Sequence, residues 1–230
     1  MDAAETRLAP LQQPSAPLRS KIIAAIRSAI ETGLWQPGRR LVEKDLCEQL
    51  SVSRTSLREA LRELQAEGIL DDAGSRGLSV SAISEHDARN IYRMRAVLEA
   101  MAVEQFIDTA SDAEFHALVQ DAKVLTRAYC AGVLHDVLIA KRDFYRRICT
   151  GAANPIALEV IERLVLRTSS LRARSLVRKP RQAQSVAEIE ALVQAIVARD
   201  AAAARQAAMA HVDNAARSAL DHGLPPAASA

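Results

Sequence analysis

The sequence predicts a mainly α-helical protein, with an N-terminal winged helix-turn-helix followed by an all-helical bundle domain of six or seven helices. Two observations support this prediction. Residues 41–80 contain a short helical pattern, a turn, an amphipathic second helix and a glycine-bearing hairpin. From residue 84 onward, apolar residues recur at helical spacing and proline is nearly absent until Pro155. The 230 residues, 49% of them hydrophobic, are sufficient to bury two cores.

The predicted winged helix-turn-helix spans residues 17–83 and begins with an amphipathic helix that ends at Gly33. Its apolar stripe consists of Leu18, Ile22, Ile23, Ile26 and Ile30. A turn at Pro37-Gly38 precedes a short helix over Glu43–Leu50. Val42 stands at the start of that helix, where it offers no capping oxygen.

The second helix of the motif has the pattern of a DNA-reading helix. Ser53 can cap its first turn. Its buried face is predicted to consist of Leu57, Ala60, Leu61 and Leu64. This register leaves Arg54, Thr55 and Arg58 pointing outward, and arginine can grip a guanine edge with two hydrogen bonds.

A small hairpin follows this helix. Gly68 is expected to end the helix, and Ile69 and Leu70 to begin a strand. A turn over Gly74–Gly77 then leads into a second strand over Leu78–Val80. Arg76 is expected at the tip of this wing.

The second domain is predicted to span residues 84–222. Its first helix carries Ile91, Met94, Leu98 and Met101 at helical spacing. Further helices are predicted over Leu134–Cys149, Pro155–Arg174, Ser185–Ala198 and Ala201–Leu220. Residues 1–16 and 223–230 lack periodic apolar positions and are expected to be flexible ends.

Composition narrows the class of protein. The net charge is only +2, so a DNA-binding surface requires local segregation of basic residues. Cys47, Cys130 and Cys149 are odd in number and form no CxxC pair, which argues against a disulfide framework or zinc knuckle and favours a cytoplasmic protein. No apolar run is long enough for a bilayer, so no membrane association is expected. Catalytic signatures such as GxGxxG, GxSxG and HExxH are absent, so we expect no enzyme.

The stretches LWQPGRRLVEKDLCEQLSVSRTSLREALRELQAEGIL and SRGLSV resemble the DNA-binding domain of the GntR family of bacterial transcriptional regulators. The resemblance implies binding to double-stranded DNA. Carried over position by position, it assigns DNA contacts to Lys44, Ser53, Arg54, Thr55, Arg58, Arg76 and Gly77. We expect Arg54 and Arg58 to read bases.

The stretches YRMRAVLEAMAVEQF, DFYRRICTGAANP and ARDAAAARQAAMAHVDNA resemble the FCD ligand-binding domain of the FadR-like branch of this family. Most such domains hold a divalent metal with one Asp and three His. The corresponding positions here are Lys141, Tyr145, Ile189 and His211, so the resemblance leaves one of the four ligands. Since one imidazole does not hold a metal tightly, we expect no metal and no other cofactor.

Two interpretations of this altered site remain open. In the first, the Lys141 ammonium replaces the metal as anchor for an anionic effector, Tyr145 and His211 donate hydrogen bonds, and Arg95 grips a carboxylate. In the second, Tyr145 and Ile189 merely fill space and Lys141 points to solvent. Arg95 has an alternative role as well, a salt bridge with Glu99 at i, i+4.

The preferred functional hypothesis is a ligand-responsive transcription regulator, and in particular a repressor. It would bind a short palindromic operator as a homodimer and respond to a small carboxylate-bearing metabolite. The alternative is a constitutive repressor whose second domain only dimerises. An enzyme is the least favoured class.

Overall fold

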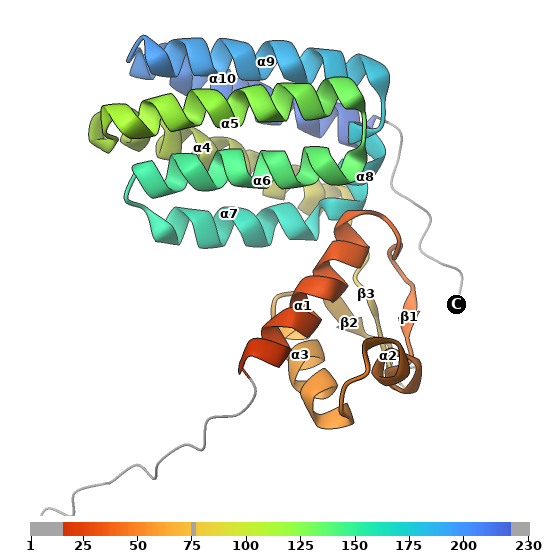
Figure 1. Ribbon diagram of the computed structural model, residues 1–230. Helices are drawn as coiled ribbons and strands as arrows, with labels where there is room; N and C mark the ends of the chain where they lie inside the picture. The colour runs from red at the N-terminus through yellow and green to blue at the C-terminus, as the bar shows by residue number, and fades with distance from the viewer. Residues whose placement is uncertain (1–15, 75–76, 222–230) are drawn as a thin grey trace, which may run out of the picture.

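The computed structural model describes residues 16–74 and 77–221. The predicted flexible ends lie outside these ranges, apart from Ala16, and so does Arg76 at the predicted wing tip. The described chain has the predicted architecture, a small winged domain below a larger helical domain (Figure 1).

The winged domain contains three helices and a three-stranded antiparallel sheet with strand order β1-β3-β2. The helices are α1 (Ala16–Glu31), α2 (Glu43–Leu50) and α3 (Arg54–Ala66). The strands are β1 (Arg40–Leu41), β2 (Leu70–Asp72) and β3 (Leu78–Val80). The hairpin strands were predicted, whereas β1 was not, because two residues carry no periodic pattern.

Local chemistry explains the ends of these helices. The Ser53 hydroxyl accepts a hydrogen bond from the Ser56 amide at 3.2 Å, so the predicted cap of α3 is confirmed. Val42 makes no capping hydrogen bond at the start of α2, because its side chain has no oxygen to accept one. Gly68 adopts the positive φ of +71° that ends α3, and the Ile69 amide bonds back to the Leu64 carbonyl.

The core of the winged domain differs from the prediction at one end of α1. Leu18 is 39% exposed, so the buried stripe of α1 begins at Ile22. At the other end this core reaches the helical domain, because Leu166 is one of its members. The two domains are therefore joined by shared apolar packing as well as by the chain.

The helical domain contains seven helices among the described residues. They are α4 (Glu85–Thr109), α5 (Asp112–Ala131), α6 (Leu134–Gly151), α7 (Pro155–Arg167), α8 (Ser169–Leu176), α9 (Lys179–Val197) and α10 (Ala201–Leu220). Ser84 caps α4 by accepting from the Asp87 amide. None of the helices in the described ranges has the length and hydropathy needed to span a bilayer.

Three expectations for this domain were wrong in detail. The single helix predicted over Pro155–Arg174 is broken at Thr168, which separates α7 from α8. Helix α9 begins at Lys179, before the predicted Ser185, because proline is tolerated in a first helical turn. Met94 is 53% exposed, so it belongs to the outer face of α4 and not to the core.

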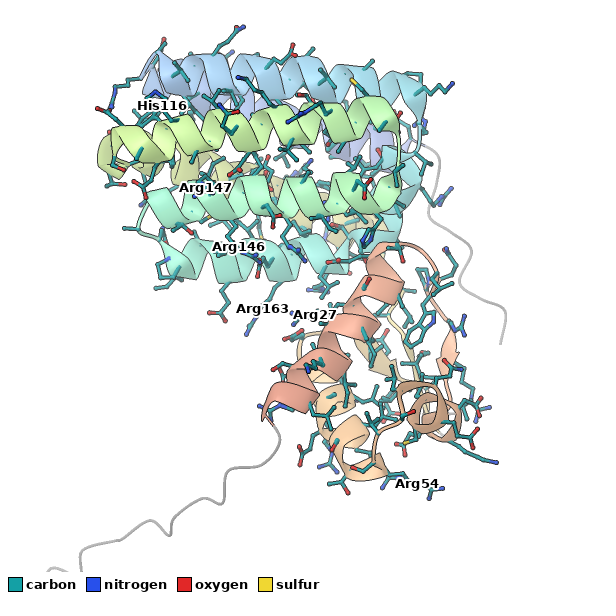
Figure 2. The ribbon with its side chains drawn as sticks, viewed as in Figure 1. Arg27, Arg54, His116, Arg146, Arg147 and Arg163 are labelled. Carbon is teal, nitrogen blue, oxygen red and sulfur yellow. The ribbon has the colours of Figure 1, made fainter. Side chains whose placement is uncertain are left out.

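The winged domain rests against the end of the helical domain formed by α7 and α8 (Figure 1). Helix α1 points its C-terminal end at α8, where Gly33 lies against Ala173. The start of α3 lies on the opposite side, and Arg54 points away from the helical domain (Figure 2). The candidate DNA-reading residues are therefore free of the larger domain.

The absent cap at Val42 gives a stability prediction. Val42→Thr keeps the branched shape and adds an oxygen for the free amides of α2, so it should stabilise the protein by about 0.5–1 kcal/mol. Urea denaturation measures this change. The control is Val124→Thr, since Val124 is similarly exposed but lies within α5, where the backbone amides are already bonded to the carbonyls of the preceding turn. A Val42→Thr gain no larger than that of the control would contradict the capping argument.

Candidate functional site

The candidate DNA-binding residues form an exposed surface on the winged domain. Ser53, Arg54, Thr55 and Arg58 are all exposed at the start of α3, and so is Lys44 on α2. Gly77 adopts φ +81° in the hairpin, with open space around the position of a side chain. This side of the molecule thus presents a helix N-terminus, arginines and backbone amides, which are groups that bind DNA.

One contact on this surface was not anticipated. The Arg58 guanidinium donates to the Glu43 carboxylate at 2.8 Å, although Arg58 remains 60% exposed. The pair joins α3 to α2 across fifteen positions of sequence, so no helical spacing revealed it. Arg58 is consequently held by a protein carboxylate in the absence of DNA, while Arg54 has no such tether among the described residues.

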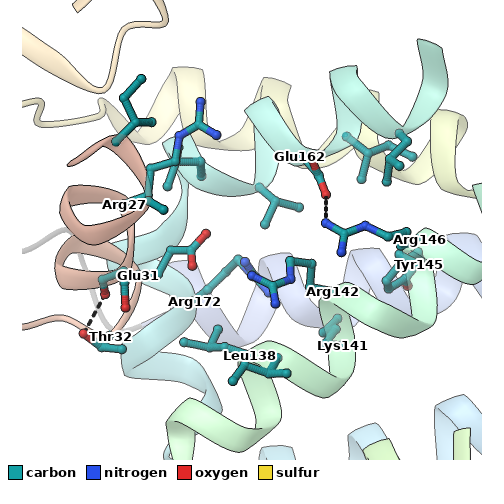
Figure 3. A pocket seen from close by; sticks show the side chains of 18 of the residues that line it. Arg27, Glu31, Thr32, Leu138, Lys141, Arg142, Tyr145, Arg146, Glu162 and Arg172 are labelled. Carbon is teal, nitrogen blue, oxygen red and sulfur yellow. Dashed lines mark hydrogen bonds and ion pairs between the residues drawn. The ribbon is translucent and has the colours of Figure 1, made fainter. Parts of the chain in front are cut away.

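A cavity of about 430 Å³ lies between α1 of the winged domain and helices α6 and α7 (Figure 3). Apolar side chains line its middle, among them Ile23, Leu138, Ile161 and Val165. At its inner end stand three basic residues, Arg95, Lys141 and Arg172. The cavity therefore combines an apolar wall with a cationic end, and residues from both domains border it.

Arg95 takes part in a buried ion pair at this inner end. It is 1% exposed, and its guanidinium lies 2.8 Å from the Glu99 carboxylate. This confirms the salt bridge that the i, i+4 spacing allowed. One guanidinium nitrogen of Arg95 and one Glu99 oxygen have no hydrogen-bond partner among the described residues. Arg95 therefore keeps a donor for a ligand while its charge is balanced by Glu99.

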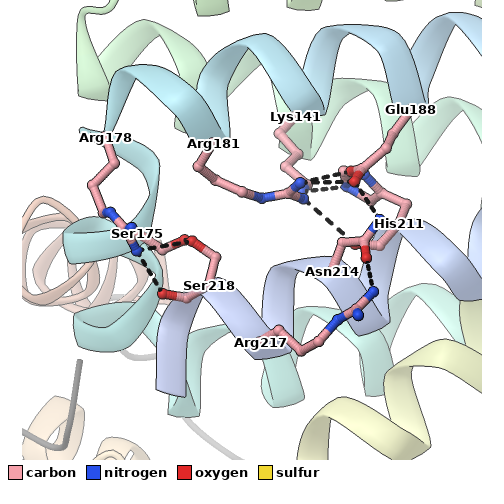
Figure 4. Close-up of polar contacts among 9 residues, drawn as sticks. All are labelled: Lys141, Ser175, Arg178, Arg181, Glu188, His211, Asn214, Arg217 and Ser218. Atoms are coloured by element: carbon pink, nitrogen blue, oxygen red, sulfur yellow. Dashed lines mark hydrogen bonds and ion pairs between the residues drawn. The ribbon is translucent and has the colours of Figure 1, made fainter. Parts of the chain in front are cut away.

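Lys141 is buried, which contradicts the interpretation that it points to solvent. Its ammonium nitrogen lies 2.8 Å from Nε2 of His211, and Nδ1 of His211 lies 2.6 Å from the Glu188 carboxylate (Figure 4). Since an ionised carboxylate only accepts, Nδ1 donates to Glu188 and Nε2 accepts from Lys141. Both ring nitrogens of His211 are thus used within the protein. The expected role of His211 as a donor to the effector is wrong in this arrangement, because the imidazole positions Lys141 instead.

Arg181 and Glu188 are members of this network that the sequence did not reveal. The Arg181 guanidinium donates to Glu188 at 2.8 Å, and the side chain is 4% exposed (Figure 4). Hydrogen bonds and charge from His211 and Arg181 outweigh partial burial and hold the pKa of Glu188 at about 2. Glu188 immediately precedes Ile189, the position aligned with a metal ligand. The sequence prediction considered only the aligned position and therefore missed Glu188.

Burial also alters the titration of the remaining groups. Burial, Arg172 and Arg95 lower the pKa of Lys141 well below its usual value. Burial and the Glu99 charge raise the pKa of Tyr145 well above its usual value. The Tyr145 hydroxyl has no hydrogen bond of good geometry among the described residues. The Tyr145 hydroxyl is therefore neutral and able to donate, and Lys141 gives up its proton more readily than a surface lysine.

Arg172 is the most unusual residue of the cavity, and sequence reasoning missed it. It is 8% exposed, and its guanidinium points into the cavity (Figure 3). Within the described part of the chain its side chain makes no hydrogen bond or ion pair shorter than 4 Å. Burial and the Arg95 charge lower its pKa. The helix breaks at Thr168, and Arg172 on the following helix then points inward. The continuous helix predicted over Pro155–Arg174 did not indicate this orientation.

The donor set at the positions that the resemblance aligns with metal ligands does not fit a divalent cation. The Lys141 ammonium takes the Nε2 lone pair of His211 that a metal would need. Ile189 is fully buried and has no ligand atom. Elsewhere in the described ranges, His, Cys, Asp and Glu side chains do not gather in a group of three or more that could hold a metal.

Residues 18–80 match the bacterial regulatory proteins of the gntR family, and residues 90–214 match the FCD domain. The chain belongs to the GntR family of transcriptional regulators. This GntR regulator has the order of the two domains that its sequence predicted. The match to both domains agrees with the winged and the helical parts of the fold.

Several curated relatives resemble this GntR regulator. McbR of Escherichia coli (strain K12), an HTH-type transcriptional regulator, is 30% identical over 142 residues, which cover 62% of this chain and 64% of McbR. YdhC of Bacillus subtilis (strain 168), an uncharacterized HTH-type transcriptional regulator, is 33% identical over 45% of this chain and 46% of its own length. The chain thus spans between about half and two thirds of these relatives. GlaR of E. coli (strain K12), an HTH-type transcriptional repressor, is 26% identical over 81% of this chain and 89% of GlaR.

Solved structures give the same result for the fold. The structure of E. coli McbR/YncC superposes with a TM-score of 0.75 at 26% identity, over 87% of this chain and 95% of that one. A GntR regulator from Rhodococcus sp. RHA1, with 20% identity over 90% of this chain and 99% of that one, shares the fold with a TM-score of 0.76.

The histidine at the centre of the network predicts how stability depends on pH. Burial, the largest cause, and the Lys141 charge lower the pKa of His211 from 6.5 to about 4. Between these values the unfolded chain binds a proton that the folded chain does not, so the free energy of unfolding falls as the pH falls from 6.5 to about 4. His211→Gln should be less stable at pH 7 but should lose less stability across this window.

The measurement is the thermal unfolding midpoint of both proteins from pH 7 to pH 4. His116→Gln is the control, because His116 is exposed and its replacement should leave the slope of the native protein unchanged. Parallel curves for the native protein and His211→Gln would rule out His211 as the source of the pH dependence.

Proposed function

We propose that this GntR regulator responds to a small anionic metabolite that binds at the inner end of the cavity, and that it represses transcription when bound to its operator. The observation that carries the proposal is the buried, unpaired guanidinium of Arg172. A guanidinium remains protonated in proteins, so its burial requires a compensating anion.

The charge balance around the cavity supports this proposal. Four basic side chains lie close together in the helical domain against two carboxylates; they are Arg95, Lys141, Arg172 and Arg181, facing Glu99 and Glu188. Burying an unbalanced charge costs on the order of several kcal/mol. Lys141 can escape this cost by losing its proton, because its pKa is lowered, whereas the Arg172 guanidinium has no carboxylate of the described residues within 4 Å. A carboxylate accepts two parallel hydrogen bonds from such a guanidinium.

The rest of the cavity favours a ligand with one charged end. Apolar side chains contribute to its lining, and two of its other basic residues have carboxylate partners, since Arg27 pairs with Glu67 and Arg146 with Glu162. Arg142 also lines the cavity and has only a 3.6 Å contact with the adjacent Asp143, so it is a further cation near the charged end of the ligand. We propose a monocarboxylate with an apolar body, held by Arg172 and Arg95, with Lys141 and Tyr145 as further donors.

No metal has a part in this proposal. The Lys141 amine occupies the lone pair of His211 Nε2 that a metal would need, and Glu188 holds His211 in this orientation. Effector binding should therefore be insensitive to chelators.

We further propose that the regulator acts as a homodimer on a short palindromic operator. One reading helix gives limited discrimination, whereas two heads about 34 Å apart match two half-sites. Met94 and Val97 lie on the outer face of α4 with 53% and 52% exposure, and such apolar residues suit a contact with a second copy. Repression is proposed because the relative GlaR is named a repressor.

A constitutive repressor is the second candidate. The chain from Lys141 through His211 to Glu188 satisfies each of its members without a ligand, which favours a purely structural helical domain. An enzyme is not proposed, because the sequence carries none of the GxGxxG, GxSxG or HExxH motifs.

Thermal unfolding with acetate, hexanoate and benzoate, each with and without EDTA, tests the anion site. Hexanoate and benzoate should raise the unfolding midpoint more than acetate, because their apolar bodies can pack against the apolar wall of the cavity. EDTA should not change these shifts. Stabilisation amounts to about 2.7 kcal/mol when the ligand is at 100 times its Kd. Arg172→Gln and Lys141→Met should abolish it while retaining binding to operator DNA selected from a random pool.

The control for these variants is Arg163→Gln, since Arg163 is an exposed residue on α7 outside the cavity lining. Stabilisation that disappears with EDTA would restore a metal to the site. Absence of any effect of the three anions on the native protein would favour the constitutive candidate.

The DNA surface gives a separate prediction. Arg58→Ala should weaken operator binding by about tenfold to hundredfold and relax the preference at one base pair, because one bidentate contact discriminates by about 1–3 kcal/mol. Fluorescence anisotropy on the selected operator and on single-base variants measures both effects. Arg163→Ala serves as control, since its exposed side chain lies on the helical domain. Equal loss of affinity on every sequence would assign Arg58 to phosphate contact instead of base reading.

A further inference from the structure

Glu31 lies where the winged domain meets the cavity. It is the last residue of α1 and lines the same cavity as Arg172, which comes from α8 of the helical domain. Figure 3 places its carboxylate beside the Arg172 side chain. Glu31 is partly buried, and within the described ranges its carboxylate makes no ion pair shorter than 4 Å.

The charge of Glu31 acts on Arg172 through space. Among the influences on Arg172, burial and the Arg95 charge lower its pKa, whereas the Glu31 carboxylate raises it. Arg95 is already balanced by Glu99, and Arg181 by Glu188. Glu31 is therefore the carboxylate of the cavity wall that is left to offset Arg172.

We infer that Glu31 belongs to the effector site, as the counter-charge of Arg172 in the empty protein, and that the carboxylate of the effector takes over this role on binding. The inference rests on the anion site proposed above. It adds a residue from the DNA-binding domain to a site otherwise built from the helical domain. An anion that reaches Arg172 enters the space that Glu31 faces, and two carboxylates at close range repel each other.

Displacing Glu31 would act on the whole winged domain, because α1 is firmly attached to the reading helix. Ile22 and Ile26 of α1 are buried in the core shared with α3. Two ion pairs strengthen this attachment: Arg19–Glu63 at 3.4 Å joins the two helices, and Arg27–Glu67 at 2.5 Å joins α1 to the residue that caps the end of α3. A shift at the end of α1 therefore moves α3 with it, which links occupancy of the cavity to the placement of the DNA-reading residues.

The test compares Glu31→Gln with the native protein in titration calorimetry with hexanoate. Glutamine keeps the size of the side chain and removes its charge. With the internal counter-charge gone, hexanoate should bind roughly tenfold more tightly, as expected for a charge several ångströms away in a partly buried site. Glu63→Gln is the matched control, since Glu63 also lines the cavity from the winged domain but pairs with Arg19. Its hexanoate affinity should equal that of the native protein.

A second readout uses operator DNA without any anion. Loss of the attraction between Glu31 and Arg172 should shift the operator affinity of Glu31→Gln in the same direction as hexanoate shifts that of the native protein. Opposite shifts would overturn the inference. So would equal hexanoate affinity in Glu31→Gln and the native protein, although the anion site itself would then stand. Failure of acetate, hexanoate and benzoate to bind either protein would overturn the anion site and this inference together.

Discussion

The excess of buried positive charge is the constraint on which the helical domain depends. Its members come from five helices: Arg95 and Glu99 on α4, Lys141 on α6, Arg172 on α8, Arg181 and Glu188 on α9, and His211 on α10. A protein with apolar side chains of similar size at these positions would often be more stable, so stability alone does not explain this arrangement. The hydrogen bonds from Lys141 to His211 and from His211 to Glu188 fix the position of the Lys141 side chain at the cavity, where we propose that an anion binds.

The metal site that the family resemblance implies and the observed contact between Lys141 and His211 have one physical feature in common. A metal ion and an ammonium group both bring positive charge to the lone pair of an imidazole nitrogen. Lys141 does this from a position that the family resemblance aligns with a metal ligand. The difference is that an ammonium can lose its proton, and burial among arginines lowers the pKa of Lys141. The charge at this position therefore depends on what else occupies the cavity, which is not true of a metal ion.

The fold was predictable from the sequence to a large extent, because periodicity and capping act locally. The boundaries of α10 and the Ser53 cap of α3 follow directly from such patterns. The break at Thr168 could not be predicted in this way, because the sequence on both sides of it favours a helix. Tertiary packing is what ends one helix and begins another there.

The site was predictable only where the family resemblance pointed. The resemblance directed attention to Lys141, Tyr145 and His211, and the spacing of Arg95 and Glu99 gave their ion pair. Arg172, Glu188 and Glu31 were missed for a common reason. Each has a partner far away in the sequence, since Arg172 and Glu31 face each other from different domains and Glu188 bonds His211 on α10, and no local pattern encodes such a pairing.

The segment that was hardest to predict is also the one that connects the two domains. Leu166 enters the core of the winged domain, Thr168 breaks the helix, Arg172 enters the cavity, and Ala173 lies against Gly33 at the end of α1. Because these residues follow one another within α7 and α8, a change in the surroundings of Arg172 is transmitted over a few residues to two contacts with the winged domain. Packed cores respond to such changes as units and do not deform gradually. A cavity bordered by this segment is therefore well placed for a ligand to alter how the DNA-reading helix is held.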